Sequence, residues 1–598
     1  MREFSVPEVM PDPTPGATMA DAVDRNAAEA PDDVVFSRRV GTSWEPVTAA
    51  AFRDEVHAVA KGLVAAGIGP GDRIGLMSRT RYEWTVADYA IWSAGAVTVP
   101  IYETSSAEQV EWILSDSGAV ALVVETGDHE KVYAEISSAV PEVKHVWRID
   151  GGGLDALGTE GAAVTDEALA AARSARGRDD VATIVYTSGT TGRPKGCVLT
   201  HLNLLGTARS AAAVLPQLFN AEGSTLLFLP LAHVFGRLIQ GACVENRVRM
   251  GHTADVKNLV PDLGQFEPTF LLSVPRVFEK VYNTYKQRAD AAGKGKIFDK
   301  GVAVAMAYSQ ALDKGRPGLG LRVRHAFFEK VLYGPQLRAP LGGHLQFAVS
   351  GGAPLGARLG HFFRGMGITI LEGYGLTETT AAGTVNTVDH IRVGSVGRPS
   401  PGCTVRIADD GEILMQGRHV FAEYWRNPAA TAEAMRDNWF CTGDIGELDE
   451  DGFLTITGRK KELIVTAGGK NVAPAVLEDR LRSHPLVSQC VVVGDAKPFI
   501  ACLVTIDAES LGPWLEAHGR PVDTKVADLV DDPELRREIQ QGIDDANKAV
   551  SHAEAIKAFT ILPEDLSEEA GTMTPSLKVK RAVVIERYTT AINGLYRD

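Results

Sequence analysis

The chain has 598 residues, of which 45% are apolar, and its formal net charge is −15. That length exceeds what one hydrophobic core serves, so we expect two or more domains. The acidic balance argues against nonspecific nucleic-acid binding, because neutralising phosphates requires a basic face.

The N-terminal sequence and the cysteines indicate where the protein works. The first thirty residues contain no basic stretch followed by an apolar one, and no apolar run approaches the roughly 20 residues of a spanning helix. The six cysteines are dispersed, without a Cys-x-x-Cys pair or a histidine at zinc-ligand spacing. These features predict a soluble protein of the cytoplasm with reduced thiols.

Helical and strand-like segments alternate through the first part of the chain, which indicates parallel sheets covered by helices. The expected strands are residues 73–78, 96–102 and 119–125, and the expected helices are residues 83–94 and 107–115, with an earlier helix ending within residues 62–67. The stretch at residues 151–178, rich in glycine and alanine, predicts a surface connection.

Beyond about Arg392 the pattern changes to short strands joined by tight turns. Residues 404–417 and 446–458 each place an Asp-Gly pair between apolar strands, which is a strong hairpin signal. We therefore expect an α/β protein. Residues 1–458 form a large domain of helix-covered sheets with a small β-barrel-like unit, and residues 459–598 form a small α+β domain.

A loop rich in glycine and hydroxyl residues, YTSGTTGRPKG at residues 186–196, follows a predicted strand. Its glycines let backbone N–H groups converge on an anion, its hydroxyls add donors and Lys195 adds a positive charge. The hydroxyl residues are Thr187, Ser188, Thr190 and Thr191, and the glycines among them are Gly189 and Gly192. This composition suits a polyphosphate such as ATP, and the alternative is a flexible surface turn.

The loop differs from a Walker A motif, which requires a hydroxyl residue directly after the lysine, where Gly196 stands. Residues 197–201 predict a second strand, so the loop is expected to close a hairpin. In these residues the loop resembles the signature of the adenylate-forming superfamily, which includes acyl-CoA synthetases, luciferases and peptide-synthetase adenylation domains. Five separated motifs in family order extend the resemblance from about Met19 to Tyr588.

Residues 373–380, GYGLTETT, resemble the adenine and metal motif of that superfamily. The resemblance implies that Tyr374 stacks on adenine and that Thr377 lies near the α-phosphate. It also implies that Glu378, with Thr187, binds Mg²⁺, for which a carboxylate oxygen is suited. The implied adenine pocket further includes Gly351, Gly352, Ala353, Gly373 and Gly375. Taken alone, the segment could equally be an ordinary loop with a buried tyrosine.

The TGD segment at residues 442–444 resembles the one whose aspartate, here Asp444, accepts hydrogen bonds from the ribose hydroxyls. Residues 458–474 resemble the hinge between the two domains. There Arg459 would contact ribose and Lys461 would be the pivot, whereas Gly468 and Gly469 would line the pantetheine tunnel. The alternative for this hinge is a basic, solvated turn.

Near the C-terminus, residues 573–581 resemble the segment that carries the catalytic lysine. Lys578 would neutralise charge at the α-phosphate and the acyl carboxylate. Lys580 and Arg581 are close competitors in so basic a stretch, and the spacing after the Thr-Pro pair favours Lys578.

The resemblance implies two half-reactions. A carboxylate attacks the α-phosphate of ATP, giving acyl-AMP and pyrophosphate, and the thiol of CoA then attacks the acyl group. The small C-terminal domain would be mobile and would swing about the hinge between the two steps. One alternative is a fatty acyl-AMP ligase that passes the acyl group to a carrier protein, and another is a catalytically silent nucleotide- or lipid-binding relative. Luciferase-type oxidation is not excluded by the motifs.

The implied acid is a long-chain fatty acid, because residues 100–106, 229–237 and 274–283 resemble the long-chain fatty acyl-CoA synthetase branch. His233 would lie where the acyl and phosphate pockets meet, and the alternative is a satisfied buried histidine. Some long-chain members have a tryptophan gate four residues beyond this histidine, where this chain has Arg237.

A basic segment interrupts the acidic chain at residues 276–338. It contains thirteen lysines and arginines against five acidic residues, so it carries +8 and the remaining chain carries −23. We expect peripheral contact with the anionic inner face of a membrane, through helices that carry Phe298, Met306, Tyr308, Phe327 and Phe328. The alternative is a solvated helical hairpin whose apolar residues pack on the large domain.

Overall fold

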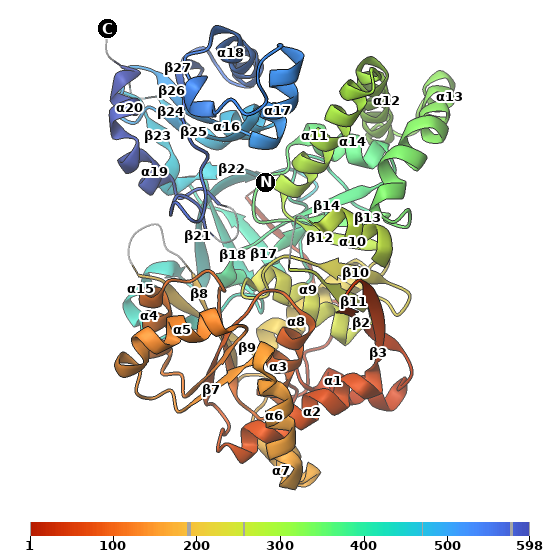
Figure 1. Cartoon of the computed structure of the whole chain (residues 1–598), viewed down its shortest axis with the longest axis vertical. Helices are drawn as coiled ribbons and strands as arrows, with labels where there is room; N and C mark the ends of the chain where they lie inside the picture. The colour runs from red at the N-terminus through yellow and green to blue at the C-terminus, as the bar shows by residue number, and fades with distance from the viewer. Residues whose placement is uncertain (1, 188–192, 255–257, 469, 575–577, 597–598) are drawn as a thin grey trace.

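The computed structural model spans residues 1–598 and describes all of them except residues 1, 188–192, 255–257, 469, 575–577 and 597–598. The N-terminal sheets and their helices form the lower part of the molecule in Figure 1. The C-terminal segment, drawn in blue, lies above them, beside a group of long green helices. None of the described helices is both long and apolar enough to cross a bilayer.

The first large sheet has seven strands. They are β4 (Arg73–Met77), β5 (Val97–Ile101), β6 (Ala121–Val124), β7 (His145–Arg148), β8 (Val181–Thr187), β9 (Lys195–Thr200) and β19 (Glu423–Tyr424). Their order is β19-β9-β8-β5-β4-β6-β7. The strands from β8 to β7 are parallel, whereas β9 and β19 are antiparallel to their neighbours. The three strands predicted from the alternating pattern are β4, β5 and β6, so the parallel sheet is confirmed.

The second large sheet has nine strands in the order β16-β15-β14-β13-β12-β10-β11-β2-β3. They are β2 (Val34–Val40), β3 (Ser43–Thr48), β10 (Ser224–Leu227), β11 (Arg249–His252), β12 (Phe270–Ser273), β13 (Phe347–Ser350), β14 (Thr369–Tyr374), β15 (Thr384–Val385) and β16 (Arg398–Pro399). The central strands from β2 to β14 are parallel. One hydrophobic core is shared by both large sheets.

Helices cover and separate these sheets. They are α1 (Asp21–Glu29), α2 (Ala49–Ala65), α3 (Tyr82–Ser93), α4 (Ala107–Ser117), α5 (Gly127–Ile136), α8 (His201–Val214), α9 (Val234–Glu245), α10 (Leu259–Phe266) and α14 (Ala357–Gly365). All residues of α3 except Glu83 are buried. A helix buried on all sides belongs inside a core, and α3 contributes to the core that both sheets share.

The stretch expected to be a surface connection contains two short helices, α6 (Gly153–Glu160) and α7 (Asp166–Ser174). Leu157 of α6 and Leu169 of α7 are buried in the shared core, so the expectation of a plain connection is wrong. Helices α2 and α6 pack closely at Gly62. A methyl group there would stand 2.1 Å from the carbonyl oxygen of Leu157. Gly62 of α2 and Gly161 after α6 therefore allow close packing, since a methyl group at Gly161 would stand 2.3 Å from the backbone nitrogen of Gly62.

The antiparallel unit predicted beyond Arg392 is a six-stranded sheet. Its strands are β1 (Glu3–Ser5), β17 (Cys403–Ile407), β18 (Glu412–Gly417), β20 (Met435–Arg436), β21 (Trp439–Leu448) and β22 (Leu454–Arg459), with helix α15 (Pro428–Ala434) before β20. The pairs β17–β18 and β21–β22 confirm the two predicted hairpins. The N-terminal strand β1 joins the edge of this sheet, which the sequence did not indicate.

The C-terminal residues form an α+β unit with cores of their own. Its strands are β23 (Ile464–Val465), β24 (Asn471–Val472), β25 (Val487–Val493), β26 (Ile500–Ile506) and β27 (Ile556–Ile561). Its helices are α16 (Pro474–Arg482), α17 (Ala508–Ala517), α18 (Pro533–Asn547), α19 (Arg581–Arg587) and α20 (Thr589–Gly594).

The basic segment folds into helices α11 (Pro275–Ala291), α12 (Gly295–Asp313) and α13 (Leu319–Phe328), followed by a π-helical stretch at Glu329–Arg338. Phe298 and Phe328 are buried, Met306 packs against the same core, and Tyr308 stacks on His325. Of the five residues expected to touch a membrane, only Phe327 is exposed, at 59%. The other four pack against the protein, as expected for the alternative of a helical hairpin whose apolar residues pack on the large domain.

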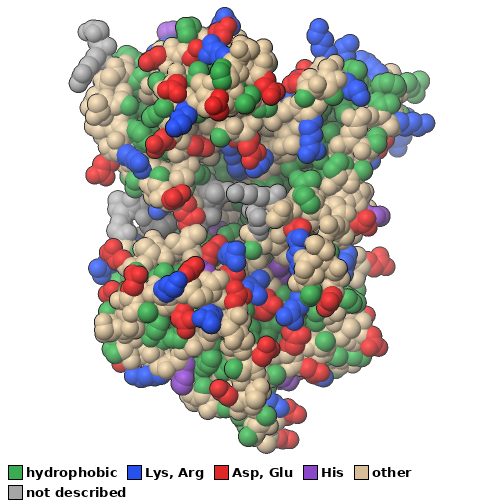
Figure 2. Space-filling model, in the orientation of Figure 1, with side chains coloured by type: hydrophobic (Ala, Val, Ile, Leu, Met, Phe, Trp, Pro, Cys, Tyr) green, Lys and Arg blue, Asp and Glu red, His purple; other side chains and the backbone are tan. Residues whose placement is uncertain are grey.

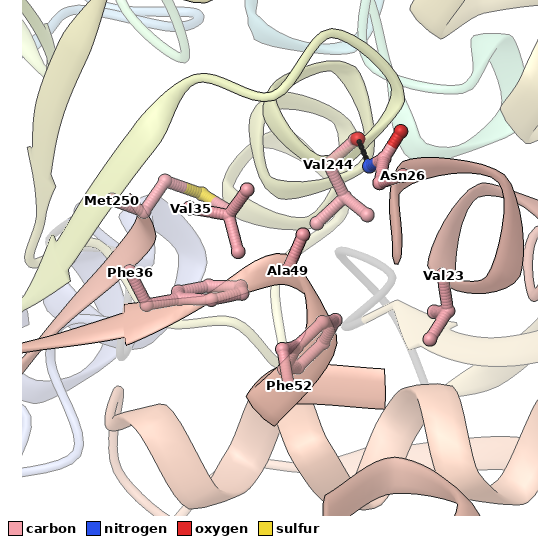
Figure 3. A pocket seen from close by; sticks show the side chains of 8 residues that line it. All are labelled: Val23, Asn26, Val35, Phe36, Ala49, Phe52, Val244 and Met250. Atoms are coloured by element: carbon pink, nitrogen blue, oxygen red, sulfur yellow. Dashed lines mark hydrogen bonds between the residues drawn. The ribbon is translucent and has the colours of Figure 1, made fainter. Parts of the chain in front are cut away.

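Figure 3 shows a small cavity where α1, α2, β2, β11 and α9 meet. Its lining consists of Val23, Asn26, Val35, Phe36, Ala49, Phe52, Val244 and Met250. The amide of Asn26 donates a hydrogen bond to the carbonyl of Val244 at 2.6 Å. The volume of about 10 Å³ leaves room for one water at most, and no predicted site residue lines it.

Candidate active site

The two stems of the glycine-rich loop are neighbouring antiparallel strands. Tyr186 faces Gly196 and Thr187 faces Lys195 in the register of β8 and β9. The predicted hairpin is therefore confirmed. The residues that close it, Ser188, Gly189, Thr190, Thr191 and Gly192, lie outside the described residues.

Side chains of α4 hold these stems. The hydroxyl of Tyr186 donates to Asp116 at 2.6 Å, and the indole N–H of Trp112 donates to the carbonyl of Pro194 at 2.8 Å. The guanidinium of Arg193 lies 4.8 Å from the centre of the Trp112 ring. The ends of the loop are thus fixed to the sheet, which places Thr187 and Lys195 side by side.

Glu378, Tyr424 and Lys195 form a chain of contacts beside the loop. The hydroxyl of Tyr424 donates to Oε1 of Glu378 at 2.6 Å, and Nζ of Lys195 lies 5.1 Å from the centre of the Tyr424 ring. Burial and the Glu378 carboxylate raise the pKa of Tyr424, so its hydroxyl keeps the proton that it donates. Tyr424 thereby links the predicted metal residue to the predicted phosphate lysine.

The residues present fit a magnesium ion at Glu378. Among the hydrogen bonds of the described residues, Oε2 of Glu378 has no partner, so one hard carboxylate oxygen remains for an ion. No group of three or more histidine, cysteine, aspartate or glutamate side chains within the described ranges is arranged to hold a metal.

Tyr374, Asp444 and Arg459 form a second cluster. The hydroxyl of Tyr374 donates to Oδ2 of Asp444 at 2.6 Å, and Nε of Arg459 donates to Oδ1 at 3.0 Å. Asp444 and Arg459 are paired neighbours on β21 and β22. Burial and the nearby Asp444 raise the pKa of Tyr374 well above its usual range. Tyr374 is buried, as the simpler alternative expects, but its partner is the predicted ribose residue.

Glycines at the ends of β13 and β14 let neighbouring groups of the protein approach closely. A methyl group would stand 3.0 Å from the Phe235 ring at Gly351, 3.0 Å from the carbonyl oxygen of Thr384 at Gly373, and 2.3 Å from that of Ala381 at Gly375. Gly352 has φ +84°, and Ala353 after it is exposed. Gly352 and Ala353 are therefore the exposed part of this glycine surface, whereas Gly351, Gly373 and Gly375 contact neighbouring protein groups.

Lys578 lies against this glycine surface, although it belongs to the C-terminal unit. A methyl group at Gly352 would stand 3.9 Å from Cε of Lys578. Lys578 remains exposed at one side, and its partial desolvation against the large domain lowers its pKa, as does the positive Arg459, whereas the carboxylates of Asp444 and Glu378 oppose this shift. Arg581, by contrast, pairs with Glu478 inside the C-terminal unit at 2.5 Å. Of these two competitors, Lys578 is the one directed toward the large domain.

His233 begins α9 close to Lys578. Its Nδ1 accepts the backbone N–H of Phe235 at 3.2 Å. Burial, and secondarily the charge of Lys578, lower the pKa of His233 to about 3. The neutral ring therefore carries its proton on Nε2, which is a donor for an acyl or phosphate oxygen.

Two of the described hinge residues are not part of this assembly. Lys461 and Gly468 are exposed, and no described contact joins them to Lys578. Gly469 lies outside the described residues. Thr377 begins a half-buried turn directly before Glu378. Among the described residues, Lys578 therefore lies near His233, Gly352, Asp444 and Glu378, whereas Gly468 lies apart from them.

The family model named AMP-binding enzyme matches residues 23–425, and the model of the C-terminal domain of AMP-binding enzymes matches residues 461–598. The chain belongs to the AMP-binding enzyme family. The expected membership of the adenylate-forming superfamily is thereby confirmed. The chain is 52% identical, over 601 residues and the full length of both proteins, to long-chain-fatty-acid–CoA ligase FadD15 of Mycobacterium bovis and of Mycobacterium tuberculosis.

Solved structures of this AMP-binding enzyme's relatives share its fold. The adenylation domain of carboxylate reductase GR01_22995 from Mycobacterium chelonae has a TM-score of 0.76 at 22% identity, covering 98% of this chain and 92% of that one. Anthranilate CoA ligase AuaEII, in complex with anthranoyl-AMP, has a TM-score of 0.71 at 20% identity, with 97% and 99% covered. These likenesses confirm the large α/β domain followed by a smaller C-terminal domain.

In this AMP-binding enzyme, the side chain of Arg237 stabilises the core. It is 4% exposed and donates to both carboxylate oxygens of Asp88 and to the hydroxyl of Thr183. Its guanidinium also lies 5.4 Å and 5.1 Å from the rings of Trp84 and Trp92. Arg237 therefore ties α9 to α3 and β8 inside the core, and it does not stand as a gate.

Proposed function

We propose that this protein activates a long-chain fatty acid with ATP and transfers the acyl group to CoA, releasing AMP and pyrophosphate. The observation that carries the proposal is the 52% identity with FadD15, a long-chain-fatty-acid–CoA ligase, over the full length of both chains. The position of Lys578 beside Gly352 and His233 supports the first half-reaction.

In the first step, a carboxylate oxygen of the fatty acid attacks the α-phosphorus of ATP, and the bond to pyrophosphate breaks. The ammonium of Lys578 would offset negative charge on the carboxylate and the α-phosphate, while Lys195 would hold the departing phosphates. Nε2–H of His233 would orient an oxygen of the acid. Mg²⁺, held by Glu378 with Thr187, would supply positive charge to the phosphate oxygens.

In the second step, the sulfur of CoA attacks the acyl carbon, AMP leaves, and the thiol proton passes to solvent. The described contacts place Lys578, and not Gly468, against the large domain, which fits the arrangement for the first step. We therefore propose that residues 459–598 turn as a body relative to residues 1–458, about a hinge near Lys461. Tyr374 would stack on adenine, and Asp444 with Arg459 would meet ribose.

We further propose that the protein is cytoplasmic and contacts the inner face of a membrane peripherally through its basic segment. Long-chain fatty acids partition into bilayers, so an enzyme that consumes them gains from proximity to one. The excess of thirteen basic over five acidic residues at 276–338 supports this contact.

Mass spectrometry of the products from ATP, CoA and acids of graded chain length tests the proposed function. We expect acyl-CoA and AMP, with the highest yield from long chains. Acyl-AMP that accumulates without acyl-CoA, and is consumed only when a carrier protein is added, would identify a fatty acyl-AMP ligase. If no acid gives a product, the protein is a catalytically silent binding protein.

A further inference from the structure

Three apolar side chains on one face of α13 are exposed to solvent. Leu319, Val323 and Phe327 are 75%, 63% and 59% exposed, which makes them the three most exposed large apolar side chains of the described residues. Spaced four residues apart on a helix that turns about 100° per residue, they form one continuous stripe. Scattered single exposures need no explanation, but an aligned stripe indicates a surface that something covers.

Basic side chains border the stripe on both sides. At about 100° per residue, Arg322 falls to one side of the stripe and Arg324 to the other. Lys314 and Arg316 precede the helix and Lys330 follows it, and all five are exposed. Among the described residues none of the five takes part in an ion pair, and no acidic residue occurs between Lys314 and Phe328. Their charges therefore remain available to a partner.

The opposite face of α13 is fixed to the protein. His325 stacks on Tyr308 with ring centres 3.8 Å apart and bonds to the carbonyl of Gly365 at 2.6 Å. Phe328 is buried, and Leu321 is half-buried on the same side. Because these contacts hold the inner face, the stripe cannot turn inward. The outer face is a fixed surface, set at the edge of the molecule (Figure 1).

We propose that α13 is a membrane-docking helix, which lies in the surface of a bilayer that contains anionic lipids. Leu319, Val323 and Phe327 enter the boundary of the acyl chains, and the flanking arginines contact lipid phosphates. Figure 2 shows apolar side chains between Lys and Arg side chains at the upper right, where Figure 1 places α12 and α13. The role in supplying a fatty acid rests on the proposed function, whereas the docking itself rests on this surface.

Charge favours a lipid surface over a second copy of this chain. A symmetric pairing through the stripe would bring Arg322 and Arg324 of both copies together, without an acidic residue on α13 to offset them. An anionic bilayer satisfies the apolar stripe and the cations at the same time. Each basic residue close to such a surface strengthens binding about fivefold.

Flotation of the full-length protein tests the proposal, with vesicles of phosphatidylcholine alone and vesicles that also contain phosphatidylglycerol. We expect binding to the anionic vesicles only, and weaker binding at high salt. The triple variant L319S/V323S/F327S and the double variant R322E/R324E should each bind more than tenfold more weakly. The matched controls are V522S, which changes a valine 58% exposed on the C-terminal unit, and K525E/K557E. These controls should bind like the wild type.

Acyl-CoA formation from a short, fully soluble acid without vesicles should stay within about twofold in every variant, since α13 lies outside the candidate active site. A wild type that forms no acyl-CoA but binds anionic vesicles through the stripe would overturn the proposed function and leave the docking surface intact. Equal, negligible flotation with both vesicle types would overturn the docking. The docking would also be overturned if sedimentation shows that the wild type is a dimer and that the triple variant is a monomer. Should the triple variant unfold, the single variant V323D gives the same test.

Discussion

The hydroxyl of Tyr424 donates to Glu378 at 2.6 Å, while its ring lies beside the ammonium of Lys195. Replacing Tyr424 by Phe keeps the ring and removes the hydrogen bond to the carboxylate. A hydrogen bond to a charged group contributes roughly 1.5–3 kcal/mol, and Glu378 is half-buried, so we expect about tenfold slower adenylation and a higher Mg²⁺ requirement. Pyrophosphate exchange measured over a range of Mg²⁺ concentrations tests this.

Tyr186→Phe is the matched control, because that hydroxyl bonds to Asp116 and not to Glu378. It should leave the Mg²⁺ dependence unchanged. If both variants shift the Mg²⁺ requirement equally, Tyr424 supports the loop as a whole and does not position Glu378.

Two side chains lie within 4 Å of a methyl group placed at Gly352 in the described part of the chain. Of these, Lys578 is the one that belongs to the C-terminal unit. Lys578→Ala should slow acyl-AMP formation by about 10²- to 10³-fold, because the charge at the α-phosphate is then uncompensated. Thioester formation from synthetic acyl-AMP and CoA should change little. Lys580→Ala serves as the control from the same basic stretch and should preserve both rates; the opposite pattern would assign the role to Lys580.

Among the structural elements, the hairpins were the most predictable. Asp410-Gly411 and Asp451-Gly452 are local signals, and each lies between strands that pair as expected. Tyr424 had no such signal, because β19 has two residues and pairs with β9 more than two hundred residues earlier in the chain. Motif resemblance named Glu378 and Lys195, but only the folded chain shows what joins them. Residues 188–192, which close the loop, lie outside the described residues.

Helix α6 was not predicted because its segment is rich in glycine, which is a poor helix former; Gly62 on the facing helix α2 is what allows the two helices to approach. Gly62→Ala would place a methyl group 2.1 Å from the carbonyl oxygen of Leu157. We expect a loss of about 1–3 kcal/mol in the free energy of unfolding, despite the better helix propensity of alanine. Urea unfolding followed by circular dichroism measures it.

Gly158→Ala, on α6 itself, provides the comparison. Its methyl group would meet only Cβ of Ala58 at 3.4 Å, an ordinary contact. This variant should be neutral or more stable by up to about 1 kcal/mol. Two equally destabilised variants would mean that α6 tolerates no alanine, and close packing at Gly62 would not be the cause.

At the scale of the whole molecule, one buried and one half-buried carboxyl, Glu372 and Asp479, lie on opposite sides of the boundary between the units and respond to pH. Burial raises the pKa of Glu372 on β14 to about 7, with Asp479 of α16 adding to the rise. Asp479 is half-buried, and desolvation raises its pKa to about 7 although its ion pair with Arg482 opposes the rise. Free carboxyls titrate near pH 4, so protonation stabilises this arrangement; the stabilisation is full below about pH 4 and is lost as the pH rises through 7.

We therefore expect the C-terminal unit to separate from the large domain more often at pH 8 than at pH 6. Energy transfer between a dye on α17 and a dye on α12 reports that separation. In Asp479→Asn the pH dependence should flatten, because one of the two groups no longer ionises. A wild-type signal that stays constant from pH 6 to 8 would contradict the expectation.

Helix α11 connects the basic segment to the C-terminal unit. Arg276 donates to Asp507 at 3.0 Å and to Ser488 at 3.2 Å, and Lys280 pairs with Glu509 at 2.7 Å. These contacts hold the arrangement in which Lys578 meets Gly352. Arg276→Gln removes a half-buried ion pair worth about 1 kcal/mol, so adenylation should slow about fivefold.

Thioester formation from preformed acyl-AMP should stay unchanged or become faster in Arg276→Gln, because the domain leaves the first arrangement more easily. Arg288→Gln, an exposed arginine on the same helix that makes no ion pair among the described residues, should change neither rate. Stopped-flow measurement of each half-reaction separates these outcomes. If both half-reactions slow equally, Arg276 acts on acyl binding, and α11 does not bias the domain arrangement.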